Sequence, residues 1–364
     1  MLGSYKNSQT IKQMNNAHPY PPAVRWWLLL GVLMVIGQVV IGGITRLTGS
    51  GLSITKWEIV TGTLPPLNAA DWEEAFDLYK ATPQYAKLND GMSMSEFKFI
   101  YFWEYFHRLW ARLMGLVFLI PFLIFWRRGW LDRPLMRRLG ITVLLAAVVA
   151  SFGWIMVASG LINRPWVNAY KLTMHLSLAF ILYGYLLWTT FKVWQPHISR
   201  FPHPVLKTWA KWVTAVLALQ IVLGGIVSGS RAALWFPSWP DMKGKWLPDV
   251  LLDSSMWTVE NFVNYDATIF FPAFIQFAHR NIAYLLTIMV LYFAYRVYKT
   301  HFSTATTVGS ILLVSMLILQ LLLGISTLIY SVGVIPVGLG VLHQAGAIVL
   351  LSIVLFMDYQ LLKE

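Results

Sequence analysis

Residues 102–115 read FWEYFHRLWARLMG, and this stretch indicates what kind of molecule the chain forms. It lies in a long apolar run, yet it carries the ionisable side chains Glu104, His107, Arg108 and Arg112. Ionisable groups are costly in the hydrocarbon core of a bilayer and usually serve a function where they occur. We therefore expect a functional segment of a membrane-spanning helix.

A second stretch repeats this arrangement. Residues 273–286 read AFIQFAHRNIAYLL, in which a His-Arg pair again opens a long apolar run, so that His279 corresponds to His107. Two further histidines, His175 in KLTMHLSLAF and His343 in GVLHQAGAIVL, each enter a later apolar run of the same half. The sequence thus predicts two pairs of intramembrane histidines.

The composition predicts a membrane protein. Hydrophobic residues make up 57% of the 364 residues and charged residues 12%, whereas a soluble globular protein carries about 25% charged residues. A spanning helix needs about 20 mostly apolar residues. Eight such runs lie near 26–44, 99–126, 138–159, 170–192, 208–228, 270–298, 306–329 and 338–361. We expect an all-α integral membrane protein with eight transmembrane helices.

The formal net charge of +12 arises from basic residues spread over the short connections between these runs. This distribution is typical of the positive-inside bias, places both termini in the cytoplasm and does not indicate nucleic acid binding. The chain contains no cysteine, which excludes disulfides and thiolate-bound metals. No cleavable signal is evident. We expect a multi-pass protein of the bacterial inner membrane, with the mitochondrial inner membrane less favoured because the polar tail lacks an Arg-rich presequence.

The second half of the chain repeats the first. GQVVIGGITR at 37–46 matches LQIVLGGIVSGSR at 219–231, each a Gly-Gly pair before an outer loop that bears an arginine, and VASGLI in the third run matches GISTLI in the seventh. Four spans per repeat mean that both halves insert in the same direction. We expect two pseudo-symmetric four-helix bundles that form a parallel repeat.

The expected domains follow from this repeat. They are an N-terminal tail at 1–25, an N-terminal bundle at 26–195 with a long outer loop at 45–98, an inner linker at 196–206 and a C-terminal bundle at 207–364. Within the outer loop, residues 67–98 mix aromatic and acidic side chains and predict a surface helix over the mouth of the bundle.

The four histidines are expected at one depth. With a rise of about 1.5 Å per residue, all of them lie roughly 8 to 14 Å below the outer face. Two imidazoles from two helices of one bundle suit the axial positions of a haem iron, whereas zinc prefers three or four ligands. The sequence therefore predicts one bis-histidine haem site per bundle. The alternative for a single histidine is a hydrogen-bonded core residue.

Glu104 and Gln276 distinguish the two halves. Glu104 is the only carboxylate expected well inside the membrane, and it shares a helix face with His107. Gln276 takes the same place in the second half and has no proton to exchange. This difference predicts chemistry in the first bundle and a redox centre in the second. An ion pair of Glu104 with Arg108 or Arg112 is the alternative.

Four arginines are candidates for contacts with haem propionates. Arg108 and Arg280 follow the first histidine of each pair, and Arg46 and Arg231 lie at the mouths of the bundles. Contacts with lipid headgroups are an equally good interpretation of these arginines.

Several long segments resemble one known family, the haem A synthases of cytochrome oxidase biogenesis, in their cysteine-free form. They are GGITRLTGSGLSITKWEIVTGTLPP, MSEFKFIYFWEYFHRLWARLMG, YKLTMHLSLA, SWPDMKGKWLP, IQFAHRNIAY and LHQAGA, and they cover nearly the whole chain in order. The first two are highly specific. The chain departs from the family pattern at LWFP, before SWPDM, which bears only on the contacts of that loop.

The resemblance implies that the chain oxidises the C8 methyl group of haem O to the formyl group of haem A, by two hydroxylations and loss of water from a geminal diol. It implies that haem O lies near His107 and His175, and that haem b is a cofactor bound by His279 and His343. Our own hypothesis adds Glu104 as proton acceptor or electrostatic stabiliser beside the reacting methyl group.

The resemblance also implies partners. They are the haem O synthase that supplies the substrate, an electron acceptor and membrane lipid, and a homo-oligomer is left open. Two other classes remain as alternatives. A di-haem b-type electron-transfer protein linked to quinone would explain the histidine pairs, but it predicts haems at two depths. A transporter with a parallel repeat would explain the duplication and leave the histidines without a role.

Overall fold

The computed structural model describes residues 18–56, 64–160, 165–196, 203–301 and 303–361, and the regular secondary structure in these ranges is helical. Within them, eight helices are long and apolar enough to cross a membrane. They are α2 (Pro22–Leu47), α5 (Met94–Arg127), α6 (Arg133–Gly160), α7 (Ala169–Trp194), α8 (Pro204–Gly229), α10 (Phe270–Thr300), α11 (Thr304–Ile329) and α12 (Val337–Gln360). Each overlaps one predicted run, so the all-helical class is confirmed, with eight candidate membrane spans among the described residues.

Local sequence signals determine where these helices begin. Pro22 and Pro204 lie in the first turns of α2 and α8, where the missing backbone N–H has no intrahelical partner to lose. Ser93 and Glu96 form a capping box at the start of α5, in which Glu96 Oε2 accepts from the Ser93 backbone N–H at 2.8 Å. This cap starts α5 ahead of the apolar run predicted at 99–126.

The surface helix predicted at 67–98 is wrong as a single element. The structure divides it into α3 (Ala69–Lys80) and α4 (Pro83–Leu88), and assigns the residues from Met94 onward to α5. Pro83 causes the break because it has no backbone N–H to continue α3, and Thr82 caps α4 by accepting from the Tyr85 N–H at 3.3 Å. The amphipathic character is confirmed, since Phe76 and Tyr79 are buried against Phe97.

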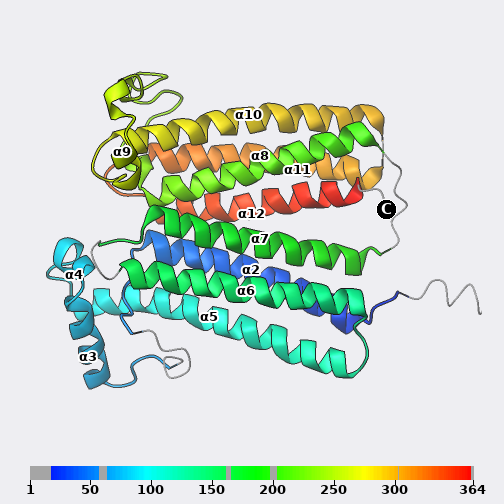
Figure 1. The fold of residues 1–364 in the computed structure, drawn as a ribbon, viewed down its shortest axis with the longest axis horizontal. Helices are drawn as coiled ribbons and strands as arrows, with labels where there is room; N and C mark the ends of the chain where they lie inside the picture. Colours follow the sequence, from blue (N-terminus) through cyan, green and yellow to red (C-terminus); the bar gives the residue numbers. More distant parts are fainter. Residues whose placement is uncertain (1–17, 57–63, 161–164, 197–202, 302, 362–364) are drawn as a thin grey trace, which may run out of the picture.

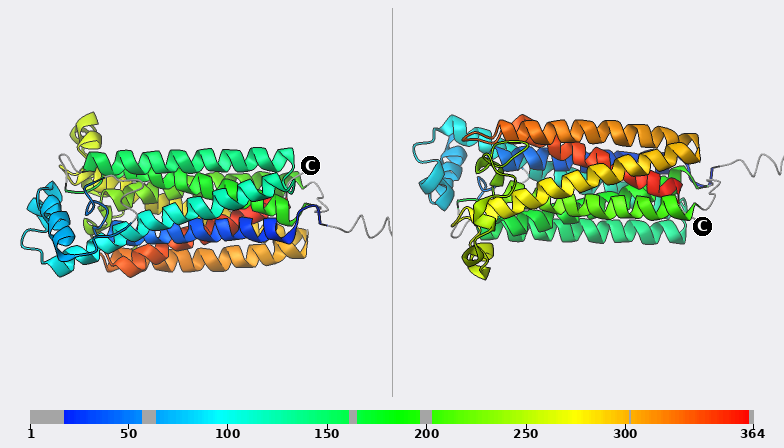
Figure 2. Two further views of the ribbon diagram at one scale, coloured as in Figure 1. Left: turned by 90° about the horizontal axis from the view of Figure 1, so that it is seen from below. Right: turned by 90° about the horizontal axis from the view of Figure 1, so that it is seen from above.

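The spanning helices form two groups that lie side by side (Figure 1). α2, α5, α6 and α7 pack together, and α8, α10, α11 and α12 pack together. Seen from the two directions of Figure 2, the helices of both groups remain close to parallel. Each group contains one of the two predicted pairs of histidines, on α5 and α7 and on α10 and α12.

Small residues bring the two groups into close contact along a seam, which consists of α7 against α8 and α2 against α12. A Cβ atom added at Gly229 would lie 2.6 Å from the Cα of Ala169, and one at Gly340 would lie 2.7 Å from a methyl carbon of Leu47. Glycine permits such backbone approach between membrane helices. The largest cluster of buried apolar side chains extends across both groups, so they share one core.

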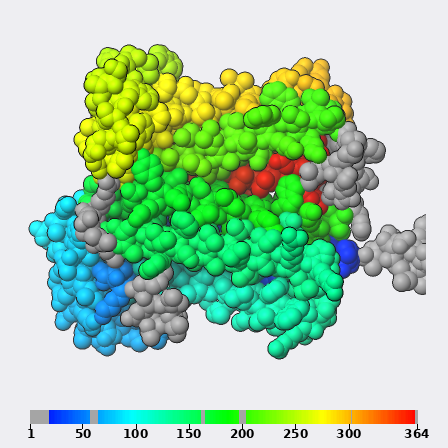
Figure 3. Space-filling model, in the orientation of Figure 1, coloured from blue at the N-terminus to red at the C-terminus, as the bar shows by residue number. Residues whose placement is uncertain are grey.

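The connections that carry the predicted outer loops gather at one end of the molecule. α3 and α4 lie there with α9 (Val259–Val263) and the short 3-10 helices Ala232–Leu234, Asp249–Leu251 and Ser254–Met256. In the space-filling view they form two separate lobes, one blue and one yellow (Figure 3). The first and last described segments lie at the opposite end, as an even number of spans requires.

Candidate functional site

Each predicted histidine lies against a glycine of another helix in its own group. A Cβ atom at that glycine would lie within 3.2 Å of the imidazole Cε1 atom. The four pairs are Gly42 with His107 at 3.0 Å, Gly153 with His175 at 3.0 Å, Gly224 with His279 at 3.2 Å and Gly324 with His343 at 2.7 Å. A Cβ atom would crowd each ring, most of all at Gly324, so glycines on four separate helices provide the same kind of imidazole cradle.

A polar group one turn before each glycine contacts the histidine. Gln38 Nε2 lies 3.2 Å from His107 Nδ1, and Gln220 Nε2 lies 3.2 Å from His279 Nε2. Gln320 Nε2 donates to the backbone carbonyl of His343 at 2.9 Å. Glutamines at the same position relative to the cradle glycine therefore contact three of the four histidines.

His175 is held differently, because Val149 stands where the other cradles have glutamine. The Nδ1 atom of His175 lies 3.0 Å from the backbone carbonyl of Val149. A carbonyl oxygen only accepts, so Nδ1 must carry the proton and Nε2 keeps its lone pair. A histidine held through Nδ1 in this way is oriented to bind a metal through Nε2.

The residues present fit a haem iron in each group. His107 on α5 and His175 on α7 belong to one group of helices, and His279 on α10 and His343 on α12 belong to the other. In the part of the chain that the structure describes, the Nδ1 atoms of His279 and His343 are buried without a hydrogen-bond partner. The same described residues contain no cluster of three or more His, Cys, Asp or Glu side chains that could hold a metal ion. Paired imidazoles are the donor set of a six-coordinate haem.

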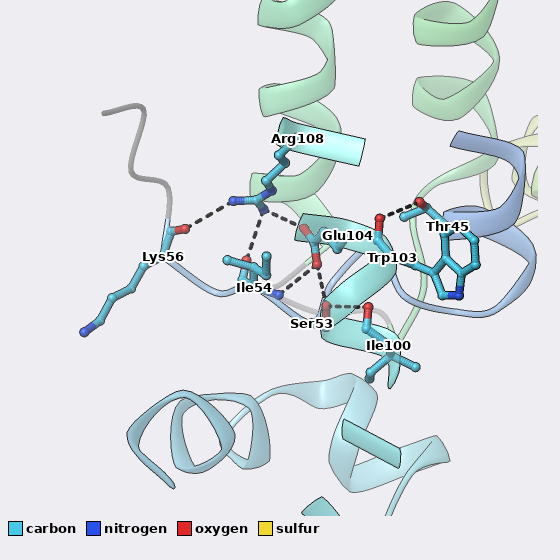
Figure 4. A network of polar contacts seen from close by, with 8 residues as sticks. All are labelled: Thr45, Ser53, Ile54, Lys56, Ile100, Trp103, Glu104 and Arg108. Carbon is cyan, nitrogen blue, oxygen red and sulfur yellow. Dashed lines mark hydrogen bonds and ion pairs between the residues drawn. The ribbon is translucent and has the colours of Figure 1, made fainter. Parts of the chain in front are cut away.

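Glu104 fastens α5 to the outer loop (Figure 4). Its side chain is 3% exposed, and Oε1 accepts from Arg108 Nη2 at 2.6 Å. Oε2 accepts from Ser53 Oγ and from the Ile54 backbone N–H, both at 2.8 Å. Arg108 also donates to the backbone carbonyls of Ile54 and Lys56. The ion pair offered as the alternative for Glu104 is thus present, with Arg108 as the partner, and a role in proton transfer stays a prediction.

The second group fastens its own outer loop from the corresponding positions. Gln276, also 3% exposed, donates to the carbonyl of Phe236 at 3.0 Å. Arg280 donates to the same oxygen at 3.1 Å and to the carbonyl of Asp241 at 2.8 Å. The two contacts therefore resemble each other and differ in charge, because the first is made by the carboxylate of Glu104 and the second by the amide of Gln276.

The arginines of the bundle mouths do not occupy matching positions in the two halves. When the Gly-Gly pairs are superposed, Arg46 corresponds to Ser228, and Arg231 corresponds to Gly49. Arg46 lies in the last turn of α2, whereas Arg231 follows the capping residue of α8 in a left-handed conformation with φ 54°. In this superposition α2 and α8 end at the same position, and the two arginines lie three residues apart.

A cavity of about 280 Å³ lies beside the Glu104 network. It is lined by residues of the outer loop, α3 and α5, among them Leu78, Tyr101, Tyr105 and Arg108. The four histidines are not among its lining residues, so the cavity belongs to the outer surface and not to the histidine cradles.

Comparison with known proteins decides the family. The family model of COX15-CtaA, described as cytochrome oxidase assembly protein, matches residues 25–355. The chain belongs to this family. The COX15-CtaA model extends from the first turn of α2 into the last turns of α12, so it includes both pairs of histidines and both outer loops.

Curated relatives agree with this assignment. The chain is 40% identical over 341 residues to the heme A synthase of Nitrosospira multiformis, with 93% of each chain covered. It is 39% identical over 330 residues to the heme A synthase of Flavobacterium psychrophilum, covering 90% of this chain and 94% of the relative. It is 40% identical over 339 residues to that of Bradyrhizobium diazoefficiens, covering 93% and 91%. The resemblance stated from the sequence motifs is confirmed.

The sequence analysis missed the glutamines of the cradles and the role of their glycines. The pattern Gln-x-x-x-Gly occurs as QVVIG at 38–42, QIVLG at 220–224 and QLLLG at 320–324, and this repeated spacing could have revealed them. The expected match of VASGLI with GISTLI stays a prediction. The glycines that contact His175 and His343 are Gly153 and Gly324, and Gly153 lies four residues before the first residue of VASGLI.

Proposed function

We infer that this chain has the activity of its relatives. It is a haem A synthase, an oxidoreductase of the membrane that converts haem O into haem A. Family membership across residues 25–355 and about 40% identity to heme A synthases over more than nine tenths of the chain support this function. The expected substrate, haem O, follows from the reaction.

The observation that carries the site assignment is the set of four glycine cradles. Residues at contact distance hold His107 and His175 in one group and His279 and His343 in the other. Haem O binds to the first pair and a resident haem b binds to the second. Bound iron would supply the redox chemistry in both groups.

Glu104 distinguishes the catalytic half. The carboxylate lies one helical turn from His107 on the same face of α5, and the corresponding position in the other half holds Gln276. Glu104 accepts a proton as the methyl group is oxidised or stabilises positive charge that develops there. Arg108 and the outer loop orient its two oxygens, so that the loop closes this end of the substrate site.

The two halves are a parallel repeat, with the N-terminal bundle at 26–195 and the C-terminal bundle at 207–364. The matching cradles of α2 with α8 and of α6 with α11 support this relation, and so do the matching loop contacts of Glu104 and Gln276. The inner linker at 196–206 lies mostly outside the described residues. Basic residues on the inner connections support cytoplasmic termini and a bacterial inner membrane location.

Expression of the chain in a bacterium that makes haem O but no haem A tests the function. We expect extracted pigment to contain haem A and haem b, identified by mass. Haem b alone would favour the di-haem electron-transfer protein and contradict the synthase. Supply of haem O by a co-expressed haem O synthase should raise the yield of haem A.

A further inference from the structure

Two arginines from different halves meet at one carbonyl oxygen. The backbone oxygen of Ser228 accepts a hydrogen bond from Nη2 of Arg46 and another from the backbone N–H of Arg231, the latter at 3.2 Å. Arg46 reaches this oxygen through its guanidinium group, and Arg231 reaches it through its backbone. Residues separated along the chain by about half its length are thus neighbours at the seam.

Each of these arginines is held by the opposite half. Arg46 belongs to α2 and donates to Ser228 of α8. Arg231 follows α8, and its guanidinium carbon lies 4.9 Å from the ring centroid of Trp166, in the connection between α6 and α7. A cation over an aromatic face is attracted to it. The crossed arrangement fixes both side chains at the junction of the two groups.

The backbone of Arg231 indicates that an arginine is specifically needed there. Its φ of 54° lies in the left-handed region, which disfavours residues with a Cβ atom. The corresponding position after α2 is Gly49, with φ 71°. Glycine would satisfy the turn after α8 more easily, so the turn itself does not account for the arginine.

Carboxylates of the described residues do not neutralise the two charges. Throughout the described ranges, the ion pairs of the structure join neither Arg46 nor Arg231 to a carboxylate. Burial lowers the pKa of Arg231 below its ordinary value. Two like charges in a poorly hydrated place are unfavourable unless an anion joins them.

Of the four arginines expected near haem propionates, these two are the better suited to an anion. Arg108 is committed to Glu104 and to two backbone carbonyls, and Arg280 to the carbonyls of Phe236 and Asp241. Arg46 lies one turn beyond Gly42 of the His107 cradle, and Arg231 lies beyond Gly224 of the His279 cradle. At about 1.5 Å per residue, the pair lies roughly 6 to 10 Å from those cradles, on the outer side.

We propose that Arg46 and Arg231 together form one carboxylate-binding site at the seam, and that its occupant is a propionate of a bound haem. Guanidinium groups bind carboxylates through paired, charge-assisted hydrogen bonds, which two convergent arginines can supply from both halves. This inference rests on the proposed function for its ligand. A phosphate headgroup of an outer-leaflet lipid has the same anionic chemistry and is the competing source.

The test compares haem b with haem b dimethyl ester, in which the propionates carry no charge. The full-length protein is purified in detergent, loaded with either haem, and its haem dissociation constant is measured by transfer to apomyoglobin. The variants are Arg46→Gln, Arg231→Gln and the double variant. Arg128→Gln is the matched control, because Arg128 lies over Trp130 at the other end of the helices.

We expect the double variant to bind haem b about 10- to 100-fold more weakly than the unchanged protein, as loss of charge-assisted bonds predicts. The dimethyl ester should bind to the unchanged protein and to the double variant equally. Arg128→Gln should change neither value. Equal weakening of both haems, or no weakening of either, would overturn the proposal.

Two further measurements distinguish propionate binding from misfolding and from lipid binding. Arg231→Gly relieves the left-handed turn and should not lower the melting temperature, so weaker haem b binding in it cannot come from misfolding. Anionic phospholipid that copurifies with each variant is quantified by mass. Loss of lipid with unchanged haem b affinity would assign the anion to a headgroup and overturn the proposal. Haem binding is measured without turnover, so the two tests are independent. Failure of the haem A assay alone would contradict the proposed function and would not affect the result on propionate binding.

Discussion

An oxygen of Glu104 lies 2.6 Å from Nη2 of Arg108 beneath the outer loop. On α10, the residue that corresponds to Glu104 of α5 is Gln276. Gln276 is uncharged and forms no ion pair with Arg280. Both side chains instead donate a hydrogen bond to the carbonyl oxygen of Phe236. An amide is therefore sufficient to fasten an outer loop. A carboxylate is thus not required for this fastening alone, and the first prediction follows from the difference between Glu104 and Gln276.

Replacing Glu104 by glutamine should stop haem A formation and leave both haems bound. The amide oxygen can still accept from Ser53 and Ile54, but it can neither take up a proton nor carry charge. Loss of a general base lowers rates by about 10²- to 10⁴-fold. The measurement is haem A yield beside total haem content in the purified protein.

Glu96→Gln is the matched control for this change. Glu96 lies in the first turn of the same helix and is exposed, so haem A yield should remain unchanged. Limited proteolysis of the outer loop distinguishes chemistry from loop closure. Normal haem A formation by Glu104→Gln would refute the proposed role, and a loop that becomes sensitive to protease would make Glu104 a positioning residue instead.

Filling a histidine cradle should impair one haem site at a time. A Cβ atom at Gly324 would lie 2.7 Å from Cε1 of His343, so Gly324→Ala must displace the imidazole. We expect loss of most haem b and retention of the site in the other half. Gly140→Ala is the control, because a Cβ there meets no atom within 4 Å. The haem content of each variant, measured by pyridine haemochrome spectra, checks this expectation.

Removing a ligand should be selective in the same way. His279→Ala should abolish the low-spin haem b spectrum, because one axial nitrogen is lost from the second pair. His107→Ala should keep that spectrum and lose haem A formation. Optical and electron paramagnetic resonance spectra of the membranes distinguish the two outcomes. A full low-spin haem b signal in His279→Ala would contradict the ligand assignment.

The fold and the histidine pairs could be predicted because they depend on local patterns. Long apolar runs require helices in a bilayer, and ionisable groups inside them are costly enough to be conspicuous. His107 and His279 are recognisable for this reason. The grouping of each with a second histidine followed from the repeat of spans along the chain.

The surroundings of the histidines could not be predicted in the same way. Gly153 contacts His175 through packing between α6 and α7, and a glycine in an apolar run does not reveal which neighbour it meets. Arg46 and Arg231 become neighbours because the two halves pack across the seam. The similar sequences at the ends of α2 and α8 do not predict this packing. The partner of Glu104 was open between Arg108 and Arg112, since both lie on nearby helix faces.

The seam between the two groups should be sensitive to a single methyl group. A Cβ atom at Gly229 would lie 2.6 Å from the backbone of Ala169, so Gly229→Ala must push α8 away from α7. Overpacking of this kind costs about 1 to 3 kcal/mol, and we expect a lower melting temperature in detergent. Gly338→Ala serves as the control because its Cβ atom would meet open space. Equal melting temperatures of the two variants would show that α7 and α8 do not pack as closely as the structure indicates.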